Sequence, residues 1–354
     1  AVNARRFCEE HGLDAEASEL VPWLVKNHLV MSRTAQTQDL SDPDVIVAFA
    51  KLVASDRRLV ALYLLTVADI RGTSPKVWNA WKAKLLEDLF RLTRARLGGA
   101  SAGNLLKARQ DDALQLLRLD ALADDAHAAF WRELETSYFL RHDPDEIAWH
   151  TRMLNYRVAP DSPVVKARLS PAGEGLQVLI YVLDQKDLFA RICSFFQRIN
   201  YNIVEAKIYT TRHGYALDTF QVMDWTHKEL KYRDVMSYVE YELTQELVSG
   251  RPLPPRVWGR VSRQLKHFPI TPEVKLISDD KGAYYILSIT AGDRPGLLSG
   301  VARILAEYEV NIRDAKINTL GERAEDVFLV NGEVLSDARA VIRLERALVQ
   351  ELQT

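Results

Sequence analysis

The chain has 354 residues, of which 47% are hydrophobic and 27% are charged, with 46 Lys and Arg against 48 Asp and Glu. This composition is typical of a folded globular protein with two or three domains, and it excludes the disordered and fibrous classes. The net charge of -2 provides no basic field that would attract nucleic acid or an anionic membrane. No apolar run approaches the ~20 residues that a membrane span needs. We therefore expect small ligands and protein partners, with no nucleic acid and no membrane.

Cysteine usage and the first residues bear on where the protein works. The two cysteines, Cys8 and Cys193, lie far apart. From this spacing, and from the lack of a signal-peptide pattern in the given residues, we expect a cytoplasmic protein. The first residue is Ala1 rather than Met, and residues 4–8 already have the pattern of a helix without a start signal. We expect that the N-terminus is cut and that any catalytic residues upstream have been lost.

Residues 1–160 have the apolar spacing of three and four that is typical of helices. Helix starts are predicted at Asp42 and at Ser74, where a capping side chain precedes a proline. The Gly- and Ala-rich residues 98–103 predict a break between helices. The result is an all-α region.

A further helix is predicted to begin after Asp143. Asp143 can cap this helix, and Glu146 completes a capping box. We therefore interpret the dipeptide His142-Asp143 as part of a helix start and not as a metal-binding pair.

The apolar period changes from about 3.6 to 2 after Pro160, and the sequence from residue 164 onward repeats itself. The pattern Asn-Ile-x-x-Ala-Lys-Ile at residues 202–208 recurs at 311–317, an offset of 109. The offset is 108 later on, where Asp218-x-Phe-x-Val recurs at Asp326. One deletion therefore lies in the turn between two strands.

Each repeat predicts the order strand, strand, helix, strand, strand, helix, with the fourth strand of the sheet supplied by the segment before the core unit. This order forms a four-stranded antiparallel sheet with two helices on one face. We expect an all-α region followed by two α+β ferredoxin-like domains with antiparallel sheets, at residues 164–250 and 273–354, joined by a linker at 251–272.

The motif that begins at Asp293 reads Asp-Arg-Pro-Gly-Leu-Leu and predicts a ligand site. Pro295 fixes φ near the helix start, Gly296 allows a ligand close to the backbone, and the helix N-terminus near Leu297 favours a carboxylate. Asn311 opens the next strand with an amide that suits the charged groups of an amino acid. The alternative is that these residues only cap the helix and shape the turns.

The first copy has Asp184 and Asn202 at the equivalent positions, but its loop reads Asp-Gln-Lys-Asp-Leu and lacks Pro and Gly. Close backbone approach is harder with a side chain in place of glycine. We therefore predict that the second copy, through Asp293, Gly296 and Asn311, is the better site, facing the first copy or another subunit.

The arrangement of strand, Asp-Arg-Pro-Gly-Leu, helix and Asn-Ile resembles the ACT domain. That family implies a regulatory module that binds amino acids at interfaces between paired modules. We expect ACT–ACT pairing within or between chains.

The whole chain also resembles the C-terminal part of the family of bifunctional uridylyltransferase/uridylyl-removing enzymes. In that family a nucleotidyltransferase domain adds UMP to the PII signal protein, an HD-type metal-dependent phosphohydrolase removes it, and two ACT domains sense glutamine. The resemblance implies glutamine as effector, PII as partner, residues 1–97 as a truncated HD domain and residues 98–160 as a helical connector. It rests on both ACT-like units and on the segments at residues 23–32, 63–71, 77–82 and 145–150.

The resemblance identifies Asp69 with the last metal-ligand Asp of the hydrolase, and His28 with a possible neighbour of that site. The complete enzyme would use Mg²⁺ or Mn²⁺, but a lone Asp and a lone His cannot hold a metal. We expect no complete catalytic site and no tight metal binding in this chain. From the residues alone, Asp69 lies in an apolar run, where a buried carboxylate would need a partner such as Arg71, and His28 could equally serve packing or hydrogen bonding.

Two lysines at equivalent places in the repeat, Lys207 and Lys316, are expected on the exposed edge or face of the sheet, without a chemical role.

A different functional class stays open beside the enzyme fragment, namely a stand-alone ACT-repeat regulator without catalysis. The coding sequence upstream of Ala1 would discriminate between them. We expect no unaided phosphodiester hydrolysis by the helical half.

Overall fold

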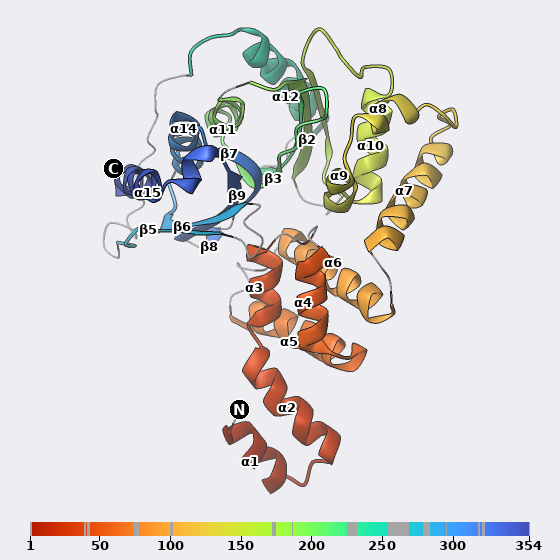
Figure 1. The fold of residues 1–354 in the computed structure, drawn as a ribbon, viewed down its shortest axis with the longest axis vertical. Helices are drawn as coiled ribbons and strands as arrows, with labels where there is room; N and C mark the ends of the chain where they lie inside the picture. Colours follow the sequence, from red (N-terminus) through yellow and green to blue (C-terminus); the bar gives the residue numbers. More distant parts are fainter. Residues whose placement is uncertain are drawn as a thin grey trace. The chain divides into compact units, whose positions relative to one another are not determined.

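The computed structural model describes residues 2–38, 40, 43–73, 78, 80–99, 102–171, 175–185, 187–224, 232–253, 269–278, 284–294, 296–317, 319–320 and 323–353 (Figure 1). The chain divides into two compact units, Ala1–Asp112 with Phe139–Asp143, and Ala113–Tyr138 with Pro144–Thr354. The division falls inside helix α7 (Ala102–Leu119). The residues predicted as a helical connector, 98–160, therefore contribute to both units.

The first unit is helical. Helix α6 packs against α3, α4 and α5, and leucines of α6 such as Leu86 and Leu89 are buried with Phe49 of α4 and Leu62 of α5. α4 begins at the predicted proline, and the break near residues 98–103 separates α6 from α7, while Asp42 and Ser74 lie outside the described residues. The helices of this unit before α7 are α1 (Val2–Glu10), α2 (Ala15–Asn27), α3 (Val30–Thr37), α4 (Pro43–Val53), α5 (Asp56–Thr73) and α6 (Ala80–Leu97).

Polar contacts hold residues 139–143 in the first unit. Arg109 of α7 is 9% exposed, and its guanidinium donates to the carbonyls of Phe139, Leu140 and His142 at 3.2, 2.6 and 3.0 Å. These carbonyls lie in and just after α9 (Thr136–Arg141). The contacts make this cation a cap for the end of α9. The carboxylate of Asp143 contacts two cations, Lys84 at 2.9 Å and Arg91 at 3.1 Å.

The second unit contains a mixed helix and sheet region in which the strands lie in the order β1-β2-β4-β3-β7-β9-β6-β5, with β8 paired to β9. All described strand pairs are antiparallel, and α11, α12, α14 and α15 gather on one side of the sheet (Figure 1). The predicted fold class is confirmed. The strands are β1 (Val164–Leu169), β2 (Leu176–Leu183), β3 (Tyr201–Lys207), β4 (Tyr215–Asp224), β5 (Glu273–Ser278), β6 (Tyr285–Gly292), β7 (Asn311–Lys316), β8 (Thr319–Leu320) and β9 (Arg323–Asn331). The helices are α8 (Ala128–Arg132), α10 (Pro144–Leu154), α11 (Leu188–Arg198), α12 (Tyr232–Val248), α14 (Leu297–Glu307) and α15 (Ala338–Gln353), with a 3₁₀ turn η1 (Glu333–Ser336).

The two repeats are related by a pseudo-two-fold axis at the centre of this sheet. Strand β3 pairs with its own equivalent β7, and Ala206 lies opposite its repeat counterpart Ala315. The flanking backbone bonds are also symmetric, since Ile208 N–H donates to the Arg313 carbonyl at 3.3 Å and Ile317 N–H donates to the Val204 carbonyl at 3.2 Å. Such self-complementary pairing is the geometry of an isologous dimer, formed here within one chain.

Equivalent apolar positions build a continuous core under this pairing. Phe220 of β4 and Phe328 of β9 are both fully buried, and the helices α11 and α14 pack on each other with the hydroxyls of Ser194 and Ser299 3.0 Å apart.

Within the described part of the chain, no helix combines the length and the apolar character needed to cross a membrane.

A candidate ligand cavity between the two repeats

A cavity of about 640 Å³ lies between the two repeats of the second unit. The first repeat lines it with the loop that follows β2, including Asp184 and Asp187, and with the first turn of α11. The second repeat lines it with the last turn of α14 and the first residues of β7, including Asn311 and Arg313. The volume lies within the range of protein pockets that hold small ligands. This cavity is therefore our candidate site.

The loop of the first repeat enters α11 through a residue in the left-handed region. Asp187 has a φ of 68° and precedes Leu188, whose N–H donates to the carbonyl of Gln185 at 3.3 Å. Among the described residues, the side chain of Asp187 makes no capping hydrogen bond to the helix. The Thr210 hydroxyl donates to the carboxylate of Asp184 at 3.0 Å. The carboxylate of Asp184 is thus oriented by Thr210, which lies between β3 and β4. The carboxylate of Asp187 does not cap the helix that it precedes.

The loop of the second repeat follows the same backbone path with different residues. Gly296, the equivalent of Asp187, has a φ of 98°, and the N–H of Leu297 donates to the carbonyl of Arg294 at 3.2 Å. The Arg294 guanidinium donates to the carbonyl of Glu351 in α15 at 2.8 Å. The glycine is therefore not required for this loop conformation, which an aspartate adopts in the first copy.

The cavity combines predicted residues from different copies. Asp184 of the first repeat and Asn311 of the second both line it. Pairing across the pseudo-two-fold axis accounts for this combination, because the loop of the first repeat faces the start of β7 in the second. The prediction that the second copy is the better ligand site is untested, and the cavity described here takes its loop from the first copy and Asn311 from the second. The other predicted ligand residues do not line this cavity: Asp293, Gly296, Leu297 and Asn202, while Pro295 lies outside the described residues.

The lining groups suit a small zwitterion. Asp184 and Asp187 provide carboxylates that would attract an ammonium group. Phe189 and Ala190 belong to the first turn of α11 and line the cavity, and the N–H groups of a first turn lack partners within their helix and favour an anion. The amide of Asn311 offers both a donor and an acceptor. An α-amino acid carries both of these charges on one carbon atom.

Asp218 is the most buried polar residue among the described residues that line the cavity, and the predicted set of ligand residues does not include it. It lies on β4, lines the cavity and is 1% exposed, and its carboxylate accepts from the N–H of Tyr209 at 3.3 Å. Burial, and then the neighbouring charge of Asp184, raise the pKa of Asp218 well above its ordinary value. The sequence contains a signal for this residue. An Asp occurs at the same place in both repeats, Asp218 and Asp326, where the alternating pattern of the strand otherwise has apolar residues facing the core.

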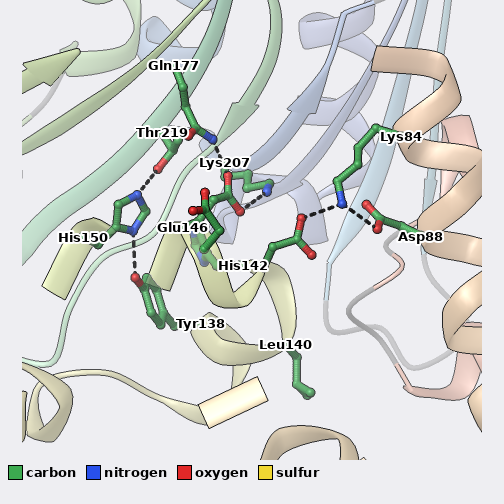
Figure 2. Close-up of polar contacts among 12 residues, drawn as sticks. Lys84, Asp88, Tyr138, Leu140, His142, Glu146, His150, Gln177, Lys207 and Thr219 are labelled. Atoms are coloured by element: carbon green, nitrogen blue, oxygen red, sulfur yellow. Dashed lines mark hydrogen bonds and ion pairs between the residues drawn. The ribbon is translucent and has the colours of Figure 1, made fainter. Parts of the chain in front are cut away.

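The opposite face of β4 carries a buried polar network (Figure 2). The hydroxyl of Thr219, the residue after Asp218, lies 3.1 Å from Nε2 of His150 in α10. His150 is fully buried, and its Nδ1 lies 2.7 Å from the Tyr138 hydroxyl. Successive residues of a strand point to opposite faces. Strand β4 therefore lines the cavity with Asp218 and contacts α10 with the next residue, Thr219.

A buried ion pair also joins α10 to the sheet. Lys207 Nζ lies 2.6 Å from the Glu146 carboxylate, and the two side chains are 17% and 6% exposed. Gln177 of β2 donates to the same carboxylate at 2.6 Å (Figure 2). Lys207 is thus partly buried, and Lys316 is buried, at 8% exposure. The prediction of exposed lysines is wrong, because both lie on the two central strands and α10 contacts the sheet at Lys207.

The two predicted metal-site residues lie in the first unit and do not form a site. Asp69 is exposed on α5, because the buried positions of that helix end at Thr66; the expectation of a buried carboxylate is wrong. His28 is also exposed, with Nδ1 3.0 Å from the Val25 carbonyl. No group of three or more His, Cys, Asp or Glu within the described ranges could hold a metal ion. These residues therefore do not fit a Mg²⁺ or Mn²⁺ site on their own.

Two segments match known protein families. Residues 101–153 match the family described as the fifth domain of uridylyltransferase GlnD, and residues 285–343 match the ACT domain. The first match includes nearly all of α10, and the second covers most of the second repeat. The resemblance of this repeat to the ACT domain is confirmed.

The whole chain has close relatives among curated proteins. It is 55% identical over 352 residues to proteins named bifunctional uridylyltransferase/uridylyl-removing enzyme from Burkholderia mallei (strain SAVP1) and Burkholderia pseudomallei (strain K96243). The aligned region is 99% of this chain and 41% of each relative. The chain thus spans less than half the length of these relatives. No solved structure matches it.

Proposed function

This chain is similar along 99% of its length to the C-terminal part of the bifunctional uridylyltransferase/uridylyl-removing enzymes, and we propose that it forms the effector-sensing part of such an enzyme. In this proposal the effector is glutamine, and the protein substrate of the enzyme is the PII signal protein. The ligand would favour either the addition of UMP to PII or its removal. Residues 1–97 would belong to the domain that removes UMP.

The cavity between the repeats is the observation that carries this proposal. Its carboxylates at Asp184 and Asp187 and the first turn of α11 provide opposite charges for the ammonium and carboxylate of an amino acid. Because both repeats line the cavity, a ligand there would contact both at once. Differential binding to two arrangements of the repeats is what a regulatory ligand requires.

A route from this cavity toward the rest of the enzyme would run through β4. Asp218 lines the cavity, and the next residue, Thr219, contacts His150 in the segment that matches the fifth domain of uridylyltransferase GlnD. We infer that a shift of β4 on ligand binding would be transmitted to α10. The element that moves would be the strand together with this helix.

Calorimetric titration of the 354-residue chain with L-glutamine tests the proposal. We expect saturable heat, and we expect Asn311→Ala to weaken binding by roughly tenfold, because the hydrogen bonds of its amide to the ligand are lost. The matched control is Asn202→Ala, which alters the equivalent residue of the other repeat outside the cavity. Absence of heat with the folded wild-type chain at millimolar glutamine would contradict the proposal.

A further inference from the structure

Asp218 is a buried carboxyl group that lines the cavity between the repeats. It lies on the inward face of β4, opposite Ile180 of β2, between Ala216 and Phe220, which belong to the hydrophobic core. The residue is 1% exposed and lines the cavity. A carboxyl group in such apolar surroundings is costly to ionise. Its position inside a ligand cavity therefore calls for a role in recognition.

The charged groups around Asp218 are mostly acidic. Among the described residues that line the cavity, Asp184 and Asp187 come from the loop of the first repeat, Glu309 comes from the second repeat, and Arg313 is the one cation. The backbone N–H of Tyr209 is the donor to Asp218. Burial and the charge of Asp184 raise the pKa of Asp218, so that the proton is held more firmly than on an exposed aspartate.

An amide and a carboxylate differ in how they can pair with such a group. An amide side chain can accept from a protonated carboxyl and can donate to an ionised one, so it is satisfied in both states. A carboxylate can pair only with the protonated state, because two ionised carboxylates in one buried site repel each other. Two ligands of the same length, glutamine and glutamate, would therefore bind differently.

We propose that Asp218 is the residue through which this cavity selects an amide side chain and rejects a carboxylate. This inference rests on the proposed function, since it requires that an amino acid occupies the cavity. Asp218 would then act in two ways, because it pairs with the amide of glutamine and repels the carboxylate of glutamate. The rejected ligand would have to bind together with a proton.

The test compares L-glutamine with L-glutamate on the full 354-residue chain by calorimetry, between about pH 6 and pH 8.5. In the wild type, at the pH values where Asp218 is ionised, we expect glutamine to bind at least about 100-fold more tightly than glutamate, because two ionised carboxylates in contact repel each other. Glutamate should bind more tightly as the pH falls, because a larger share of Asp218 is then protonated and can donate to the ligand carboxylate. At pH values where Asp218 is ionised, glutamate should take up a proton on binding, seen as a dependence of the heat on buffer ionisation. Glutamine affinity should stay nearly constant.

Two isosteric variants locate the effect. Asp218→Asn should reduce the preference for glutamine to less than about tenfold, because an amide can donate to the carboxylate of glutamate. Asp326→Asn alters the equivalent buried residue of the second repeat, which is 2% exposed, and should leave the preference unchanged. A folded Asp218→Asn chain that keeps the wild-type preference would overturn the inference, as would a loss of preference in Asp326→Asn.

The wild-type chain alone provides a second test that does not depend on the folding of a variant. A preference for glutamine that is the same across the pH range, without proton uptake by glutamate, would contradict the role of Asp218 while leaving glutamine binding intact. Absence of binding by both ligands would instead contradict the proposed function itself. The two failures are therefore distinguishable.

Discussion

The same loop conformation is built with aspartate in one repeat and with glycine in the other. Asp187 and Gly296 both have positive φ, 68° and 98°, and the neighbouring hydrogen bonds match. For an L-residue with a side chain, this conformation costs on the order of 1–2 kcal/mol. Strained residues of this kind often accompany ligand sites, and Asp187 lines the cavity.

The exchange of these two residues tests the cost of the conformation. Asp187→Gly should raise the free energy of unfolding by up to about 1 kcal/mol, since relief of strain exceeds the added entropy of the unfolded chain. Gly296→Ala should lower it by about 1 kcal/mol or more for the opposite reason. Urea denaturation followed by circular dichroism measures both changes. Equal stability of wild type and Asp187→Gly would argue against strain at this position.

Asp218 should make stability depend on pH in a defined direction. Its pKa is raised in the folded chain, so the folded state binds the proton more tightly than the unfolded state. The stabilisation is fully present below the unfolded pKa and is lost as the pH rises through the folded pKa. Asp218→Asn should therefore lose less stability than the wild type between about pH 5 and pH 8.

Urea denaturation at a series of pH values checks this dependence. The control is Asp161→Asn, which removes an exposed acid and should follow the wild-type curve. If Asp218→Asn also followed that curve, the carboxyl would not carry a proton into the folded state.

At the level of single residues, the sequence identifies candidate ligand residues better than it predicts which of them lie together in the folded chain. The acid and amide at Asp184 and Asn311 are identified from their place in the motif, and both line the cavity. Their combination in one cavity depends on the pairing of β3 with β7, which no local pattern contains. Asp69 is exposed although it follows an apolar run. The last buried residue of α5 is Thr66, so the helix is no longer packed against other elements at Asp69.

At the level of elements, α10 is joined to the first repeat by polar contacts that are mostly buried. Glu146 and Lys207 form an ion pair with little exposure, and Gln177 adds a hydrogen bond. Two charges are costly to bury, and the loss of one partner leaves the other uncompensated. The capping-box pattern predicts Glu146 at a helix start. It does not predict the contact with Lys207, which lies in β3, about 60 residues further along the chain.

Removal of the Glu146 charge tests the value of this contact. Glu146→Gln should lower the free energy of unfolding by roughly 3 kcal/mol, and Lys207→Met in the same chain should recover much of the loss. The exposed pair of Arg118 and Asp124, with side chains 66% and 85% exposed, provides the control, and Asp124→Asn should change stability by less than about 0.5 kcal/mol. A similar small effect at Glu146 would mean that the buried pair does not stabilise the docking of α10.

Arg109 should have a comparable effect in the first unit. It donates to three carbonyls that lie in and just after α9, so Arg109→Leu would leave buried acceptors without this donor. We expect a loss of roughly 2–4 kcal/mol, measured by thermal or urea unfolding. Lys107→Leu, at an exposed position of the same helix, is the control. Equal unfolding curves for the two variants would contradict the capping role.

At the scale of the whole chain, the internal repeat carries most of the predictable information. The offset of 109 residues relates β1 to β5, β2 to β6 and α11 to α14 in the structure, and the bulges in β3 and β7 occur at equivalent residues. The sheet topology of each repeat therefore follows from sequence. The pairing of the repeats does not, because the same strand edge could have paired between two chains.

The most direct test of the account is a crystal structure of the 354-residue chain grown with L-glutamine. We predict density for the ligand between the Asp184 loop and Asn311, with its side-chain amide within hydrogen-bonding distance of Asp218. Ligand density between the Asp293 loop and Asn202, with the first cavity empty, would contradict this assignment of the site.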